Sequence, residues 1–424
     1  MGNPSCEVNA VAMVLSTLPL SYCTNVHPGR SLDEVLAGLE RYTLGIRQRF
    51  GSPLAAGLWL AQPVICELTA TRANFDRLRD WLLSHELPCY TLNAFPYGDF
   101  HSDRVKEQVY LPDWTEPARR DYTLQCAKLL AELLPEGADG SISTVPLGFK
   151  ALVGHFWKPG FSESRASLVD EARLSEKPGF IDRCIEQLID TARGLQQLHH
   201  DTGRVIRLAI EPEPLCVLET TAETVAFFHR LRDRAARDGA HEAVEQHLGV
   251  CYDVCHQAVE FEDVAASIRQ LARDRIRINK VHLSCAIHVD RPADPETRTA
   301  LARYIEPRYL HQTFARTATG VVSQVDLDEA LTNDPPEEFR TASAWRVHFH
   351  VPVDAERLGP LRTTRPELQQ ALAVLPELDY APHLEVETYT WEVFPGGGRT
   401  ELVEGFAREL MATRKLFMAL EHPH

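Results

Sequence analysis

Residues 207–214 read RLAIEPEP, in which a short apolar run ends in the carboxylate of Glu211 and is followed by proline. Three later apolar runs end in the same way, at Asp253 in GVCYD, at His282 in KVHLS and at Glu387 in HLEVE. The carboxyl ends of parallel strands meet at one edge of a barrel, and carboxylate oxygens with one imidazole suit an open catalytic metal site. These residues therefore predict parallel strands that together bind a divalent ion, Mn²⁺, Mg²⁺ or Zn²⁺.

A repeated order of strand, loop and amphipathic helix runs along most of the chain. Strand-like segments are expected to end near Asn25, Leu60, Asn93, Thr144, Glu211, Asp253 and Ser284. Helices are predicted over residues 31–50, 70–86, 116–134, 178–200, 221–238, 262–274, 364–376 and 400–419. Two helices begin with capping-box patterns, at Ser31 and at Thr220. So many βα units favour a closed (β/α)8 TIM barrel, and the first strand is not followed by the GxGxxG turn of a doubly wound sheet.

The segment over residues 286–382 is irregular, with charged and proline-rich stretches and one further strand-like run at 345–353. We expect residues 383–389 to form the eighth barrel strand and the run at 345–353 to be an added element outside the barrel. Residues 1–17 are expected to be an N-terminal extension, and residues 18–424 one TIM-barrel domain with insertions.

Composition narrows the functional classes. The chain has 424 residues, of which 44% are hydrophobic and 25% charged, as in soluble globular proteins. A formal net charge of −16 argues against a nucleic-acid partner. No apolar stretch is long enough to span a membrane, and the first twenty residues lack the basic start of a signal peptide. The ten cysteines include no CxxC pair and are expected to be buried thiols in a reducing cytoplasm.

Two positions of the predicted metal site have rivals. His348 and His350 share one face of the added strand and are alternative imidazole donors to His282. Glu385 and Glu387 also point to one side, and two carboxylates inside a barrel are costly unless a cation lies near them. We favour Glu387 as the ligand because it lies nearer the carboxyl end of its strand, with Glu385 as a partner in the interior.

Substrate contacts are expected from loops at the same edge. The loop after the third strand is rich in aromatic and hydrogen-bonding residues, which is typical of a lid or a substrate wall. His256 lies three residues after Asp253, where it could bind substrate hydroxyls or simply face solvent. The expected substrate-contacting residues are Asn93, Tyr97, His101, Glu213, His256, His348, His350 and Glu385.

The order Glu, Asp-x-x-His, His, Glu on strands five to eight resembles the xylose-isomerase-like superfamily of sugar isomerases and epimerases. More narrowly, four strings resemble the bacterial metabolite-traffic family EboE. These strings are LSYCTNVHP (20–28), FPYGDFHSDRVKEQVYLPDW (95–114), SISTVPLGFK (141–150) and HLEVETYTW (383–391). The resemblance covers nearly the whole chain from about residue 18.

This resemblance implies a TIM barrel that takes part in making or moving a small metabolite. It implies that Glu211, Asp253, His282 and Glu387 are metal ligands and that His256 contacts substrate. The favoured expectation is a metal-dependent isomerase or epimerase of a sugar, sugar phosphate or cyclitol, in which Glu211, Glu387 and His256 are catalytic. The alternatives are a non-catalytic metabolite carrier and a metal-dependent phosphoester hydrolase. A homo-oligomer is compatible with each of these three functions.

Overall fold

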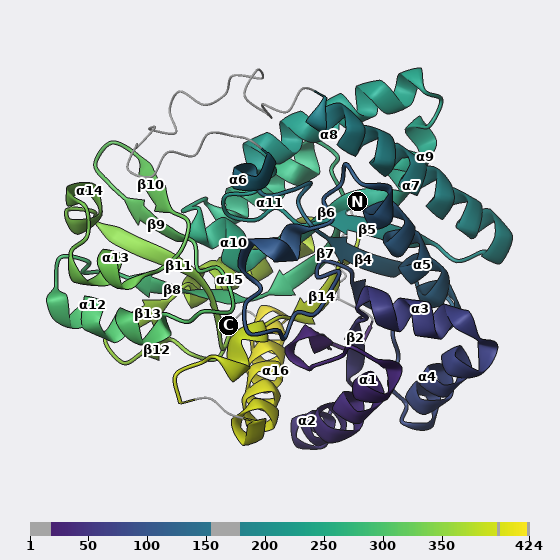
Figure 1. Ribbon diagram of the computed structural model, residues 1–424, viewed down its shortest axis with the longest axis horizontal. Helices are drawn as coiled ribbons and strands as arrows, with labels where there is room; N and C mark the ends of the chain where they lie inside the picture. The colour runs from purple at the N-terminus through teal and green to yellow at the C-terminus, as the bar shows by residue number, and fades with distance from the viewer. Residues whose placement is uncertain (1–17, 154–178, 397–398, 422–424) are drawn as a thin grey trace, which may run out of the picture.

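A closed barrel of eight parallel strands forms the centre of the molecule (Figure 1). The computed structural model describes residues 18–153, 179–396 and 399–421, so the expected extension at 1–17 lies outside the described residues. Around the barrel the strands follow the order β1-β14-β7-β6-β5-β4-β3-β2. Their bounds are β1 (Ser21–Cys23), β2 (Ala55–Trp59), β3 (Thr91–Asn93), β4 (Gly140–Thr144), β5 (Ile206–Ile210), β6 (Leu248–Asp253), β7 (Ile278–Leu283) and β14 (His383–Val386). The predicted TIM barrel is therefore confirmed, with His383–Val386 as its eighth strand.

Helices surround this barrel, and every predicted helix has a counterpart, whereas those at residues 62–70 and 241–247 were not predicted. The larger ones are α1 (Leu32–Gly38), α2 (Leu44–Phe50), α3 (Gln62–Ala70), α4 (Arg72–Ser84), α5 (Pro117–Leu133), α7 (Phe180–Thr202), α8 (Thr221–Arg237), α9 (His241–His247), α11 (Val264–Arg273), α15 (Arg365–Val374) and α16 (Arg399–Glu421). Shorter ones are α6 (Lys150–Val153), α10 (Val254–Val259), α12 (Pro295–Leu301), α13 (Glu329–Asn333) and α14 (Glu337–Arg340). A π-helical segment (Leu39–Thr43) divides the helix predicted over 31–50 into α1 and α2.

The two predicted capping boxes differ in outcome. At Thr220 both reciprocal bonds form, since its side chain accepts from the Glu223 amide and the Glu223 carboxylate accepts from the Thr220 amide. At Ser31 only the first bond forms, because the Glu34 carboxylate accepts from the backbone amide of Arg30 instead. The first box is confirmed and the second is half formed.

A second, antiparallel sheet lies beside the barrel and carries α12 to α14 (left in Figure 1). Its order is β10-β9-β11-β8-β13-β12. The bounds are β8 (Cys285–Val289), β9 (Thr313–Arg316), β10 (Val321–Gln324), β11 (Ala344–Val351), β12 (Arg357–Leu358) and β13 (Leu361–Thr363). Placing the run at 345–353 outside the barrel is confirmed, but the added region contains five strands besides β11. Only one residue, Ser284, separates barrel strand β7 from β8.

Helices α2 and α16 meet at the seam where the first and last barrel strands pair. Helix α16 packs against α2, where Arg49 pairs with Glu404 at 2.5 Å, and the ring of Phe406 lies 5.0 Å from that of Tyr22 on β1. Within the described part of the chain, no helix combines the length and apolar character required to cross a membrane.

His27 provides a test of packing at this seam. The residue is 4% exposed, and its ring centroid lies 4.6 Å from that of Tyr42, with the two planes tilted by 32°. Burial, with a smaller contribution from nearby His101, lowers the pKa of His27 to about 3. The unfolded chain takes up a proton near pH 6.5 and the native state does not, so stability falls as the pH drops from 6.5 toward 3.

We expect His27→Phe to remove this part of the acid sensitivity. Relative to the wild type, its free energy of unfolding should rise by about 2–3 kcal/mol between pH 6.5 and pH 4.5. Urea denaturation at a series of pH values measures the difference, and His241→Phe on the exposed surface of α9 is the control. The prediction would be contradicted if the difference in the free energy of unfolding between the wild type and His27→Phe did not change with pH.

Candidate metal centre and cavity

Four adjacent barrel strands bring the predicted ligands together. Glu211 directly follows β5, Asp253 ends β6, His282 lies in β7 and Glu387 follows β14. Asp253 pairs in register with His282, and the amide of Glu387 donates to Leu283 O at 3.2 Å. One ligand atom from each of the four lies within 4.8 Å of the others.

His282 is at the centre of this group. Its Nδ1 atom lies 2.9 Å from Glu211 Oε1 and 3.1 Å from Glu387 Oε2. Asp253 Oδ2 lies 3.6 Å from the same nitrogen. All four side chains are buried, and burying three carboxylates beside one imidazole is unfavourable without further positive charge.

The donor atoms fit a divalent cation. Glu211 Oε2 and Asp253 Oδ2 are buried and have no hydrogen-bond partner among the described residues. Buried polar atoms are normally satisfied, so an unsatisfied pair of carboxylate oxygens at one point requires an explanation. A cation among three carboxylates and one imidazole would satisfy both, and this donor set suits Mg²⁺, Mn²⁺ or Zn²⁺.

In Glu387 and Asp253, one carboxylate oxygen accepts hydrogen bonds from neighbouring side chains or amides. The other oxygen of each is directed at the centre. Glu387 Oε1 accepts from Asn25 Nδ2 at 2.8 Å and from Asn93 Nδ2 at 3.2 Å. Asp253 Oδ1 accepts from Ser284 Oγ at 2.6 Å and from the His256 amide at 3.1 Å. Such outer contacts orient metal ligands.

A buried ion pair lies beneath the centre. Lys280 Nζ is 2.7 Å from Glu385 Oε1, and the same oxygen lies 3.3 Å from His282 Nε2. Although burial raises the pKa of Glu385, the ammonium of Lys280 holds it at about 2. Glu385 thus faces the second ring nitrogen of His282, on the side opposite to the metal centre.

The carboxylates differ in charge state. Burial raises the pKa of Asp253, but the surrounding imidazoles, His256 above all, hold it well below its usual range. For Glu387 burial is likewise outweighed, by His282, and its pKa is lowered. Glu213 is different, because burial dominates and raises its pKa to about 8. Near neutral pH, Asp253 and Glu387 are ionised and Glu213 is protonated.

A cavity of about 520 Å³ opens above these residues. Its lining contains Glu211 and Glu387 of the candidate centre together with a wall of aromatic side chains. These aromatic side chains are Phe95, Phe100, Tyr110, Tyr309 and Tyr389. Lys106 also lines it, but its ammonium is bound to Tyr309 O at 2.6 Å and to Asp326 Oδ2 at 2.6 Å. The loop after β3 thus forms one wall of a largely apolar pocket.

The expected substrate residues fall into two groups. Asn93, Glu213, His256 and His348 line the cavity. The other four expected residues, Tyr97, His101, His350 and Glu385, do not line the cavity.

The side chains outside the lining have partners elsewhere. The ring of Tyr97 packs 5.0 Å from that of Tyr122, and His101 Nε2 lies 2.8 Å from Asn25 O. Sequence reasoning did not select Asn25, Lys280 or Ser284, although Asn25 stands at a predicted strand end and Ser284 lies two residues after His282.

The comparisons with known proteins concern the fold. No protein-family model matches the chain, and a search of curated proteins finds no match. A solved xylose isomerase-like TIM barrel protein from Mycobacterium smegmatis, in complex with magnesium, is 12% identical, with a TM-score of 0.46 over 96% of this chain and 99% of that chain. A D-tagatose 3-epimerase-like protein is 11% identical, with a TM-score of 0.45 over 95% of this chain and 97% of that one. IolI with a bound zinc atom is 10% identical, with a TM-score of 0.38 over the same shares of both chains.

By its own strand order the chain is a TIM-barrel protein, and it carries a candidate metal centre at the carboxyl ends of four adjacent strands. The solved structures are similar to it in architecture, and no activity is carried over from them.

Gly57 on β2 tests the buried pair beneath the centre. A Cβ atom at this position would lie 1.5 Å from Glu385 Oε2 and 2.9 Å from Tyr22 O. Gly57→Ala should therefore displace Glu385 from Lys280, and we expect a loss of about 3–5 kcal/mol in the free energy of unfolding, typical of a broken buried pair. Chemical denaturation measures this loss. Gly98→Ala is the control because no heavy atom lies within 4 Å of its Cβ, and equal stability of the two variants would refute the prediction.

Proposed function

We propose that this protein is a divalent-metal-dependent isomerase or epimerase of a small sugar, sugar phosphate or cyclitol. The observation that carries the proposal is the convergence of Glu211, Asp253, His282 and Glu387 within 4.8 Å at the base of a cavity of about 520 Å³.

The metal would be held by these four side chains. A divalent ion bound there supplies Lewis acidity toward neighbouring hydroxyl and carbonyl oxygens of a substrate. The hydrogen bonds from Asn25 and Asn93 to Glu387 and from Ser284 to Asp253 support this assignment, because they fix the carboxylates before a ligand arrives.

Glu211 and Glu387 are the proposed proton-transfer groups. They lie on either side of His282, 2.9 Å and 3.1 Å from its Nδ1, and both line the cavity. One carboxylate would remove the proton from a carbon next to a carbonyl. The other would return a proton, either to the neighbouring carbon in isomerisation or to the opposite face of the same carbon in epimerisation.

The cavity wall has two proposed roles. The aromatic side chains exclude bulk water from the reacting carbon and pack against the apolar face of a sugar ring. His256 faces the cavity and is the proposed contact for a substrate hydroxyl.

We further propose that the chain belongs to the EboE metabolite-traffic family within the xylose-isomerase-like superfamily. Three of the strings that carry the resemblance contribute to the cavity: 20–28 includes Asn25, 95–114 includes Phe95, Phe100 and Tyr110 of the aromatic wall, and 383–391 includes Glu387 and Tyr389. A role in the biosynthesis or trafficking of a small metabolite follows from that membership. A cytoplasmic location is part of the proposal, supported by the nine described cysteines, all free and eight of them buried.

One observation favours a second candidate function, metal-dependent phosphoester hydrolysis. Further groups of three potential ligands, including Glu213 with His256 and His348, lie next to the four-ligand centre. Sites with two or more ions are common among enzymes that cleave phosphoesters.

Glu387→Gln is the decisive variant for the proposed reaction. With Mn²⁺ at saturation, we expect proton exchange between a substrate C–H and D₂O to fall at least about 100-fold, because a general base is lost. NMR over a panel of ketoses, aldoses, their phosphates and cyclitols measures the exchange, and the melting temperature checks the fold. Glu377→Gln is the matched control, since that exposed carboxylate pairs with Arg269 far along the chain.

Three outcomes would contradict the isomerase or epimerase. Exchange that persists in Glu387→Gln would remove the proposed base. Metal-loaded wild type that binds panel members without exchange would indicate a carrier, and phosphate release instead of exchange would indicate a hydrolase.

A further inference from the structure

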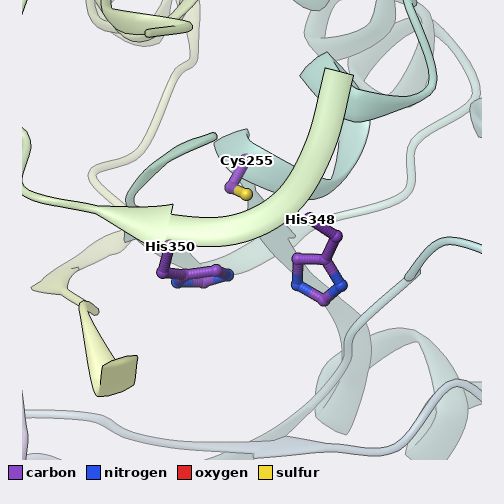
Figure 2. A group of neighbouring side chains, drawn as sticks. All are labelled: Cys255, His348 and His350. Atoms are coloured by element: carbon purple, nitrogen blue, oxygen red, sulfur yellow. The ribbon is translucent and has the colours of Figure 1, made fainter. Parts of the chain in front are cut away.

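Three buried histidines gather beside the four-ligand centre. His256 belongs to α10, whereas His348 and His350 belong to β11 of the second sheet. The ring centroid of His256 lies 4.6 Å from that of His348 and 5.6 Å from that of His350. Figure 2 shows His348 and His350 on the same side of the curved strand, near Cys255 of α10. The strand bends here because its pairing with β8 shifts register between Val347 and Val351.

In each of these rings, Nδ1 lies at hydrogen-bond distance from a carbonyl oxygen, which can accept a hydrogen bond but cannot donate one. His256 Nδ1 lies 3.0 Å from Pro212 O, and His350 Nδ1 lies 2.8 Å from Glu387 O. His348 Nδ1 lies 2.8 Å from Gln312 Oε1, and the Gln312 amide is oriented by its donation to Pro214 O at 3.3 Å. In a neutral ring the hydrogen is therefore on Nδ1, and Nε2 carries a lone pair.

Two of these lone pairs lack donors. The Nε2 atoms of His348 and His350 are buried without a hydrogen-bond partner in the described structure. An imidazole anchored through Nδ1 to an oxygen, with Nε2 free, is the arrangement of metal-binding histidines. A free Nε2 alone is not a site: His247 has one as well, with Nδ1 2.7 Å from Ile206 O, but it belongs to none of the ligand groups found among the described residues.

A carboxylate completes one set of donors. Glu213 Oε1 accepts from Tyr110 OH at 2.8 Å, and its Oε2 is buried with no partner in the described part of the chain. Ligand atoms of Glu213, His256 and His348 all lie within 4.8 Å of one another. All three side chains line the cavity, which provides a path for an ion and for a substrate oxygen.

We propose that Glu213, His256 and His348 bind a second divalent cation of the Zn²⁺ type, separate from the four-ligand centre. With this cation bound, the proposed contact of His256 with a substrate hydroxyl is made through the ion. Two imidazole nitrogens and one carboxylate oxygen are a donor set that Zn²⁺ takes in catalytic sites with an open position. The alternative group of Cys255, His348 and His350 also lies within 4.8 Å, but Cys255 and His350 do not line the described cavity. His350 Nε2 instead lies 4.0 Å from Oδ2 of Asp253, which belongs to the four-ligand centre.

The second cation specifies the substrate class. The two ligand sets share no residue and together contain four carboxylates, Glu211, Glu213, Asp253 and Glu387. Glu213 is protonated near neutral pH without a metal, and binding of the cation would remove its proton. Two dications would then balance the four carboxylates, so that the base of the cavity could accept an anionic group such as a phosphate or a carboxylate. This part of the inference rests on the proposed function, because it assumes that the first centre is also occupied.

Zinc stoichiometry tests the proposal. We expect full-length protein, stripped with a chelator and titrated with Zn²⁺ by calorimetry at micromolar concentration, to bind two equivalents. Glu213→Gln and His348→Ala should each bind one, and Glu387→Gln should retain the equivalent at Glu213. Glu213→Gln keeps the shape of the side chain and covers the case in which His348→Ala does not fold. His247→Ala is the matched control with a free Nε2 away from the cavity, and it should bind two.

Each outcome is decisive. If Glu213→Gln and His348→Ala each still bind two equivalents of Zn²⁺, the second site is overturned and the first remains. The same holds if the wild type binds only one equivalent of Zn²⁺ and Glu387→Gln alone weakens its binding. Two equivalents in the wild type, one of them lost in both variants, would support the second site even if no isomerisation is found, so the two proposals fail separately.

Gln312 is the proposed positioning residue for His348. Because it holds Nδ1, we expect Gln312→Ala to weaken the second equivalent about 10–100-fold without changing the first. The same titration measures this, and an unchanged second affinity would contradict the role. Gln324→Ala is the control, since that side chain bonds only to the nearby Asp326 O among the interactions described.

Discussion

Burial of three carboxylates around one imidazole is the constraint on which the carboxyl end of this barrel depends. His282 and the neighbouring His256 can carry at most two positive charges, so the three carboxylates of Glu211, Asp253 and Glu387 remain undercompensated in a low-dielectric interior. Neutral donors relieve part of this cost, through the amides of Asn25 and Asn93 at Glu387 and the hydroxyl of Ser284 at Asp253. The oxygens that these donors do not reach are the ones that face His282, and a cation is the natural partner for them.

The interior below the centre is organised by a complete ion pair. Lys280 and Glu385 are fully buried and 2.7 Å apart, so their charges cancel where no water can screen them. The pair also presents a carboxylate oxygen 3.3 Å from His282 Nε2. The side chain of Glu385 fits only because β2 has Gly57 at the neighbouring position. A glycine on one strand therefore helps to set the orientation of a proposed ligand on another.

Short-range patterns were sufficient to predict the barrel. Barrel strands such as β2, β5 and β6 are largely apolar runs, and adjacent parallel strands necessarily bring their carboxyl ends together. For that reason the meeting of Glu211, Asp253, His282 and Glu387 followed from the sequence. The second sheet did not, because β9, β10, β12 and β13 have at most four residues each and owe their pairing to distant partners. Gln312, Asn25 and Lys280 were missed for the same reason, since their roles depend on contacts with residues far along the chain.

The second sheet explains why the interval between His282 and Glu387 spans 105 positions. The chain leaves the barrel immediately after His282, so β8 continues directly from the strand of a proposed metal ligand. Antiparallel pairing of β11 with β8 returns Val351 to Cys285, next to the barrel mouth. At the register shift just before that point, His348 faces the cavity, and His350 lies beside Asp253 of the four-ligand centre. An insertion anchored at β7 thus places two more imidazoles beside a centre of three carboxylates and His282, and the closed barrel keeps its eight strands.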